Sequence, residues 1–313
     1  MKIPPLVTDN ILSILVVTVV VAVCITIFIR ANNSSLPENY VHVIDTKGDT
    51  PTKHYNYTVT KYNKPLVSSN ITPNDWNELV QIIGKEYNKH GAFVIYGGKD
   101  TLPYTASALA FMLENIKKPV ILTSEDLQKV SMIASGVKFP EVMIYNNKQL
   151  LRGCRTIIDL HGNLMSPRYP PLKPGLELKL PQETPGLKFI DPNISVIILK
   201  VFPGIDNNYM KGIVDNSSIN GIILDSTSQG SVPTDPAFLE SIKQLAENGV
   251  VIIALSYDGQ TDIRLLEAGA LAGYDMTCPA AYAKLLFLLS NVQDRKIIAQ
   301  LLDVNFRGEM NKI

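Results

Sequence analysis

The chain has 313 residues, 46% of them hydrophobic, which is enough for one large or two medium domains with buried cores. Its 29 basic and 29 acidic side chains cancel to a net charge of zero, so no basic surface indicates nucleic acid as a partner. The three cysteines, Cys24, Cys154 and Cys278, lie far apart in sequence, and we expect free thiols rather than a disulfide framework.

Residues 11–29 form an apolar, uncharged run after a short N-terminal tail, residues 1–10. At about 1.5 Å of rise per residue, a helix over this run nearly crosses a hydrocarbon core of about 30 Å. A cleaved signal peptide and a buried core helix are the alternatives, but the run is long for a signal sequence and no small-residue cleavage site follows it. We therefore expect a single-pass membrane anchor. Because Lys2 and Arg30 flank it evenly, the positive-inside rule favours neither orientation.

A polar linker at residues 30–40 separates the apolar run from a segment with alternating strand and helix patterns. Such alternation predicts a mostly parallel sheet covered on both faces. Within residues 41–185 the predicted strands are 41–44, 92–96, 119–123 and 141–145, and the predicted helices are 76–90, 105–115 and 125–136.

The alternation breaks in a stretch rich in Pro and Gly, residues 156–192, which indicates a link between domains with room for a small hairpin. It then resumes, and residues 186–313 are expected to form a second doubly wound α/β domain. Its predicted strands are 195–201, 221–224 and 250–255, and its predicted helices are 206–214, 235–248, 265–271, 280–289 and 294–302.

The residues that follow the predicted strands carry the functional signal, because open parallel sheets bind ligands at the carboxyl ends of their strands. Residues 97–115 read GGKDTLPYTASALAFMLEN, and this block closely resembles the segment of type I L-asparaginases in which a strand ends in His-Gly-Thr-Asp-Thr. Four further blocks agree in order and spacing: 68–76 (SSNITPNDW), 151–156 (LRGCRT), 274–277 (YDMT) and 305–309 (NFRGE). The resemblance covers nearly all of residues 41–310.

The resemblance implies two α/β domains, the larger N-terminal and the smaller C-terminal, in a homodimer or homotetramer. It places a site at the end of the N-terminal sheet, completed by a neighbouring subunit, for asparagine or an aspartate-like small molecule. In the family a threonine attacks the side-chain amide while a Thr-Asp-Lys group assists proton transfer. No cofactor and no metal ion are implied.

Carried over residue by residue, the resemblance fails where the chemistry is done. Asp49 stands at the nucleophilic threonine, Lys99 at the second threonine and Ile158 at the lysine, while Asp100 is kept. Of the residues that hold the substrate carboxylate, Ser68 and Ser69 remain.

Two roles for Lys99 follow from this pattern. A desolvated lysine can act as a base that activates Thr50 or Thr46. We favour instead an ion cluster of Asp49, Lys99 and Asp100 that fills the former substrate pocket. Asp100 is expected both to cap the following helix and to orient an ammonium ligand.

Three other polar residues receive structural interpretations. His90 and His161 have no partner at metal-ligand spacing, so both are expected to be exposed turn residues. Arg307 is expected to form an internal ion pair.

Two functional classes compete. The first is a membrane-anchored, catalytically inactive asparaginase-like protein with a scaffold or binding role, and the sequence favours it. The second is an active L-asparaginase-type amidohydrolase with a rebuilt site around Thr50, Lys99, Asp100 and Ser68.

Overall fold

The computed structural model describes residues 40–48, 50, 57–62, 65–205, 207–215, 218–226, 230–233 and 235–311. The apolar run at residues 11–29 lies outside these ranges, as does Asp49. Within them, no helix combines the length and the apolar character that a membrane span needs. Asn39–Ile313 forms one compact unit, which contains two α/β sheets with their helices.

The first sheet has, among the described residues, six strands in the order β2-β1-β3-β5-β6-β7. All neighbours pair in parallel except β7, which forms an antiparallel hairpin with β6. Apolar runs such as Ala92–Tyr96 form the central strands because helices bury both faces of the sheet. The strands are β1 (Val41–Asp45), β2 (Tyr57–Lys61), β3 (Ala92–Tyr96), β5 (Val120–Thr123), β6 (Val142–Asn146) and β7 (Gln149–Arg152).

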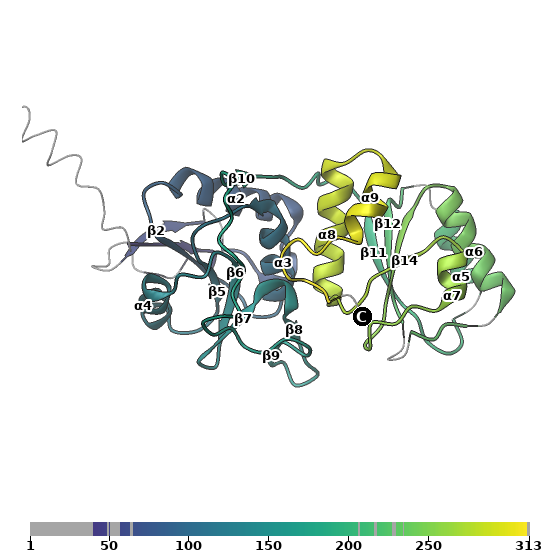
Figure 1. Ribbon diagram of the computed structural model, residues 1–313, viewed down its shortest axis with the longest axis horizontal. Helices are drawn as coiled ribbons and strands as arrows, with labels where there is room; N and C mark the ends of the chain where they lie inside the picture. Colours follow the sequence, from purple (N-terminus) through teal and green to yellow (C-terminus); the bar gives the residue numbers. More distant parts are fainter. Residues whose placement is uncertain are drawn as a thin grey trace, which may run out of the picture. The chain divides into compact units, whose positions relative to one another are not determined.

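Three helices cover this sheet (Figure 1). On one face lie α2 (Pro73–Glu86) and α3 (Leu102–Met112), and on the other lies α4 (Leu127–Gly136). The α2 helix begins at Pro73, where the Asp75 carboxylate accepts hydrogen bonds from the backbone N–H and the hydroxyl of Thr72, both at 2.7 Å. Short elements complete this half: η1 (Ser68–Asn70), β4 (Leu113–Glu114), η2 (Gly153–Arg155), β8 (Ile157–Ile158), β9 (Leu164–Met165) and β10 (Gly186–Leu187).

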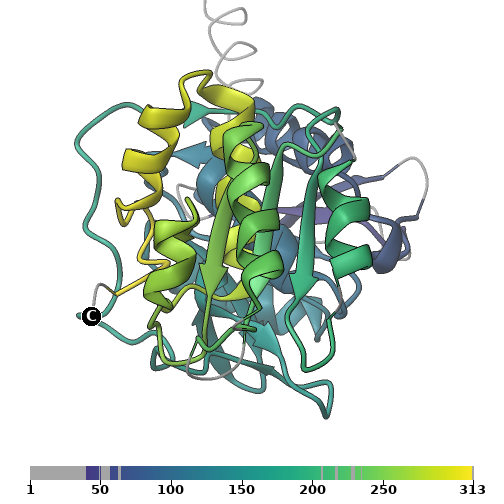
Figure 2. The ribbon, with the colours of Figure 1, turned by 90° about the vertical axis from the view of Figure 1, so that its right-hand side faces the viewer.

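The second sheet consists, in the described part of the chain, of four parallel strands in the order β11-β12-β13-β14. Helices α5, α6 and α7 pack on one face, in front of the strands in Figure 2, and α8 and α9 pack on the other. The strands are β11 (Val196–Lys200), β12 (Gly221–Asp225), β13 (Val251–Leu255) and β14 (Leu271–Ala272). The helices are α5 (Asn207–Val214), α6 (Pro236–Glu247), α7 (Ile263–Glu267), α8 (Cys278–Asn291) and α9 (Arg295–Leu302).

A shared core joins the two halves through α3 and α8. Phe111 of α3 stacks on Phe287 of α8 at 6.1 Å between ring centroids, and the rings of Tyr104 and Tyr282 meet edge to face at 5.8 Å. Nearly every α3 side chain is buried, because the helix has the first sheet on one side and α8 on the other.

The predicted two-sheet α/β class is confirmed, and the sequence-based bounds of the central elements are close to those observed. The predictions differ from the structure in several details. The helix expected at residues 265–271 is instead α7, Ile263–Glu267, and residue 271 begins the strand β14. The strands at the two edges of the first sheet, β2 and β7, were missed, and the Thr-rich sequence of β2 carries little apolar signal.

Candidate functional site

The carboxylate of Asp45 organises the loop that follows β1. Asp45 is fully buried, and it accepts hydrogen bonds from the backbone N–H groups of Lys47 and Gly48, both at 2.9 Å, and of Thr50 at 2.8 Å. Burial alone would raise its pKa, but these hydrogen bonds, with one from the Thr50 side chain, hold the pKa below its ordinary value. The loop is therefore built around a carboxylate that stays ionised.

Thr50 lies inside this loop and is only 4% exposed. Its backbone N–H and its side chain both bind Asp45. A carboxylate with a lowered pKa is a poor proton acceptor, so Asp45 is not suited to activate the Thr50 hydroxyl.

Two glycines bring three segments together at the carboxyl end of the first sheet. A Cβ at Gly97 would lie 2.8 Å from Oγ1 of Thr46, and one at Gly98 would lie 2.6 Å from Cβ of Ser68. The Thr101 hydroxyl donates to the carbonyl of Ser68 at 2.8 Å. The ends of β1 and β3 and the helix η1 therefore meet, and Ser68 is placed beside the Gly97-Gly98 turn.

Lys99 and Asp100 stand at this junction. Lys99 is half-buried, Asp100 is exposed, and the two form no ion pair with each other. The other carboxylate of the expected ion cluster, Asp49, lies outside the described residues. The predicted helix cap at Asp100 was wrong, because α3 begins at Leu102 and Thr101 occupies the N-cap position.

Ile158 lies in the short β8–β9 hairpin and packs against the main hydrophobic core. The adjoining segment is tied to the second half by a buried ion pair, in which Nη1 of Arg155 lies 2.9 Å from Oδ2 of Asp275. Ser69 is exposed, as is Val67. An aliphatic side chain at Ile158 can neither donate nor accept a proton.

The histidine prediction was half wrong. His161 is exposed in a turn, as expected, but His90 is only 3% exposed. It lies against His42 and Glu86, with ring centroids of His42 and His90 4.7 Å apart. The sequence did carry one signal for this contact, the spacing of four residues between Glu86 and His90. Side chains at this spacing lie on the same side of a helix and can meet near its end.

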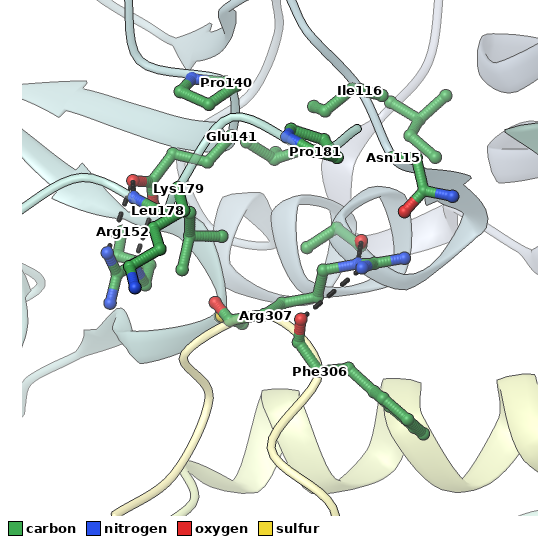
Figure 3. A pocket seen from close by; sticks show the side chains of 14 residues that line it. Asn115, Ile116, Pro140, Glu141, Arg152, Leu178, Lys179, Pro181, Phe306 and Arg307 are labelled. Atoms are coloured by element: carbon green, nitrogen blue, oxygen red, sulfur yellow. Dashed lines mark hydrogen bonds and ion pairs between the residues drawn. The ribbon is translucent and has the colours of Figure 1, made fainter. Parts of the chain in front are cut away.

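A cavity of about 280 Å³ lies between the two halves, lined in part by Glu141, Arg152, Lys179 and Arg307 (Figure 3). The ion pair predicted for Arg307 is not formed. Its Nε instead donates to the carbonyl of Ala110 in α3 at 2.8 Å, and burial lowers its pKa. Arg307 therefore caps a helix, as a cation near a helix C-terminus does.

A second cavity, of about 390 Å³, opens at the carboxyl ends of β11, β12 and β13. Lys200 and Asp225, which end the neighbouring strands β11 and β12, form an ion pair at 2.9 Å in its lining, and the lining also includes Ile157 and Cys278. Both Cys154 and Cys278 are free thiols, as the sequence predicts, and burial raises the pKa of each to about 12. Neither is suited to act as a nucleophile near neutral pH.

These features define a class of two-domain α/β proteins whose N-terminal sheet carries a cluster of loops at its carboxyl end. Residues 21–158 match the family described as "Asparaginase, N-terminal", and residues 195–302 match "Glutaminase/Asparaginase C-terminal domain". The chain belongs to the asparaginase family.

Comparison with individual proteins agrees with this assignment. L-asparaginase 1 of Escherichia coli strain K12 is 30% identical over 287 residues, which span 81% of this chain and 85% of that protein. The crystal structure of L-asparaginase I from Vibrio cholerae superimposes with a TM-score of 0.78 at 28% identity and covers 87% of this chain and 99% of its own. The 60 kDa lysophospholipase of Mus musculus is 29% identical over 319 residues, and the match spans 90% of this chain and 55% of that protein.

Proposed function

We propose that this protein binds a small amino-acid-like ligand without hydrolysing it, and serves as a membrane-anchored binding or scaffold protein on the asparaginase fold. The observation that carries the proposal is the loop after β1, where Thr50 is buried and bound to Asp45, whose pKa is lowered. Amide hydrolysis through a threonine needs a nearby group able to take the hydroxyl proton. Asp45 is a weak base, because its carboxylate already accepts hydrogen bonds from three backbone N–H groups that favour its ionised form.

The substitutions at the other catalytic positions support the same conclusion. Lys99 places an ammonium group where the family has a hydroxyl, and Ile158 places a hydrocarbon where it has an ammonium group. With Asp49, this makes three altered positions. A substitution that restores the family residue at one of them would leave the other two altered, so we do not expect it to restore hydrolysis.

A ligand pocket is supported by the residues that are kept. Ser68 lies against Gly98 at the end of the first sheet, and Ser69 follows it in sequence. Asp100, two residues after Gly98, is exposed. Hydroxyl groups suit a carboxylate and an aspartate suits an ammonium group, so aspartate and asparagine are the expected ligand class.

The alternative is an active amidohydrolase, and its specific support is the similarity to L-asparaginase 1 of Escherichia coli together with the retained Asp100. In that case Lys99 would serve as the base for Thr50. The two proposals differ in one measurable quantity, the release of ammonia.

The deciding experiment is a coupled assay of ammonia release from asparagine and glutamine by the full chain, with Thr50→Ala and Asp100→Ala as variants. We expect the unmodified chain to release no more ammonia than the two variants. Turnover that either substitution abolishes would overturn the non-hydrolytic proposal in favour of the alternative.

Ligand binding is tested separately by thermal unfolding with aspartate, because a ligand that binds only the folded state raises Tm. We expect a rise in Tm that is lost in Ser68→Ala and Asp100→Ala. An unchanged Tm with all concentrations of aspartate and asparagine would remove the binding role and leave only the scaffold.

Anchoring through residues 11–29 rests on their apolar sequence. We expect the full chain to remain with membranes after alkaline carbonate extraction and a variant without residues 1–39 to be released. Family resemblance further supports a homodimer or homotetramer, which crosslinking of the full chain in membranes would detect.

A further inference from the structure

Two histidines and a glutamate meet at the amino end of the first sheet, away from the loops that follow β1 and β3. His42 is the second residue of β1, Glu86 ends α2, and His90 lies just before β3. The two histidines are each 3% exposed, while the Glu86 side chain is 16% exposed. A buried cluster of three such groups is unusual, because polar side chains are buried only with partners or a bound ion.

The three side chains are close enough to share one ion. Each offers one ligand atom, and these atoms lie within 4.8 Å of one another. Oε2 of Glu86 is 3.6 Å from Nδ1 of His90, while Oε1 pairs with Lys89 at 3.0 Å. Ligands at Zn–N and Zn–O distances of about 2.0–2.1 Å lie roughly 3.3 Å apart in a tetrahedron, so small side-chain rotations complete the geometry.

We propose that His42, Glu86 and His90 form a binding site for a divalent transition-metal ion of the zinc class. Two imidazoles and one carboxylate are a ligand set that suits zinc, and a fourth position is left for water beside the partly exposed Glu86. Within the described residues this is the one group of three histidine, cysteine or acidic side chains with such spacing.

The surroundings resemble the outer shell of a metal site. Metal-binding histidines are oriented by a partner on the other ring nitrogen. Here both nitrogens of His42 lie near hydroxyls, Nδ1 at 2.6 Å from Thr58 and Nε2 at 3.0 Å from Thr60. Nε2 of His90 is 2.8 Å from the same Thr58 hydroxyl, and its Nδ1 is 3.2 Å from the Glu86 carbonyl. Whichever nitrogen binds the ion, the other keeps a hydrogen-bond partner.

The role of the ion follows from the elements that it would join. His42 belongs to β1, Glu86 to α2 and His90 to the turn into β3, so the ion would tie together three elements that are separate in sequence. The proposed ligand pocket lies at the opposite ends of β1 and β3. The site is therefore structural, and its test is independent of any activity of the protein.

The test uses the full chain, purified without a histidine tag and treated with a chelator that is then removed. Titration with Co²⁺ is expected to give the visible absorption bands of a tetrahedral site with one ion per chain, and Zn²⁺ to displace it. Thermal unfolding is expected to show a higher Tm with Zn²⁺ but not with Mg²⁺, because the ion binds only the folded state.

The chain has four histidines, so single His→Gln variants assign the site completely. His42→Gln and His90→Gln are expected to weaken Co²⁺ binding by more than about tenfold, and His54→Gln and His161→Gln to leave it unchanged. Glu86→Gln, which preserves the shape of the side chain, is expected to weaken binding like the first pair, with Glu240→Gln on the exposed face of α6 as its control.

Two results would overturn the proposal. One is the lack of saturable Co²⁺ or Zn²⁺ binding by the unmodified chain. The other is binding that survives in both His90→Gln and Glu86→Gln, since the ion would then be held elsewhere. Far-UV circular dichroism of each variant shows that lost binding is not lost folding.

Discussion

At the scale of single residues, Asp45 has the clearest structural role. Its carboxylate accepts hydrogen bonds from three backbone N–H groups of the loop that follows β1, so a buried charge holds this loop. Hydrogen bonds to an ionised group are stronger than neutral ones. The loop conformation therefore depends on Asp45 remaining ionised.

Asp45→Asn should lower the free energy of unfolding by about 1–3 kcal/mol, because an amide replaces one acceptor oxygen with a donor that faces N–H groups. Because the folded pKa of Asp45 lies below the unfolded value near 3.8, its ionised form stabilises the fold above that pH. This contribution is lost as pH falls through the folded pKa. Urea denaturation should thus show a difference between wild type and variant that shrinks below about pH 4.

The exposed Asp215→Asn is the matched control and should change stability little at any pH. An Asp45→Asn variant as stable as the wild type at neutral pH would contradict the role given to this carboxylate.

How far the site is predictable differs from residue to residue. The approach of Thr46 to the Gly97-Gly98 turn follows from sequence, because parallel strands end at the same edge. Ser68 reaches this turn through η1, which the sequence does not predict. The role of Asp45 could not be predicted from sequence. A carboxylate that accepts hydrogen bonds from the loop directly after it leaves no sequence pattern that distinguishes it from other aspartates. His90 was misjudged because its partner His42 comes from a strand 48 positions earlier, and only the pairing of β1 with β2 and β3 brings them together.

At the scale of secondary-structure elements, α8 is fixed by a buried ion pair. Nζ of Lys284 lies 2.8 Å from Oε1 of Glu309, with both side chains fully buried, and it also donates to the carbonyls of Leu302 and Val304. Glu309 in turn accepts from the backbone N–H groups of Phe306 and Arg307. The pair thus links α8 to the segment after α9.

Lys284→Met should destabilise the protein by about 3–5 kcal/mol, because it leaves the Glu309 charge buried without its partner. The double variant with Glu309→Gln should lose less than the sum of the two single variants, since no charge is then left unpaired. Chemical denaturation measures all three. Lys243→Met, which removes an exposed pair with Glu247, is the control and should cost under about 1 kcal/mol.

The contact between α3 and α8 gives a second prediction at this scale. Phe111→Ala should lower the free energy of unfolding by about 3–5 kcal/mol, because it removes a ring that is 1% exposed and stacked on Phe287. Phe202, which is 50% exposed, supplies the comparison: Phe202→Ala should cost little. Equal losses in a urea titration would mean that the α3–α8 contact contributes little to stability.

The sequence predicts an element well where apolar residues recur at helical spacing over many residues, as in α8. It predicts an element poorly where contacts distant in sequence, rather than local spacing, determine the structure. The α3 helix has apolar residues all round, so its central position could be inferred, but its partner could not. Strand β2 forms because β1 offers an edge to pair with, which is a tertiary effect.

At the scale of the whole molecule, the two sheets share one core through α3 and α8. We therefore expect residues 40–311 to unfold as one cooperative unit. Trp76, the single tryptophan of the chain, is buried in the N-terminal half and reports on it through fluorescence. Hydrogen exchange of the β11–β13 amides reports on the other half. The two probes should give the same midpoint in urea, and separate midpoints would show that the halves unfold independently.

The bond from Arg307 to the carbonyl of Ala110 joins residues 197 positions apart. At a translation rate of about 5–20 residues per second, the ribosome makes Arg307 roughly 10–40 s after Ala110. The α3 helix lacks its cap throughout that interval and lacks the cover of α8 until residues 278–291 have been made, so its apolar side chains face solvent or a chaperone. Nascent chains stalled before residue 280 should therefore bind chaperones more strongly than chains stalled after residue 311.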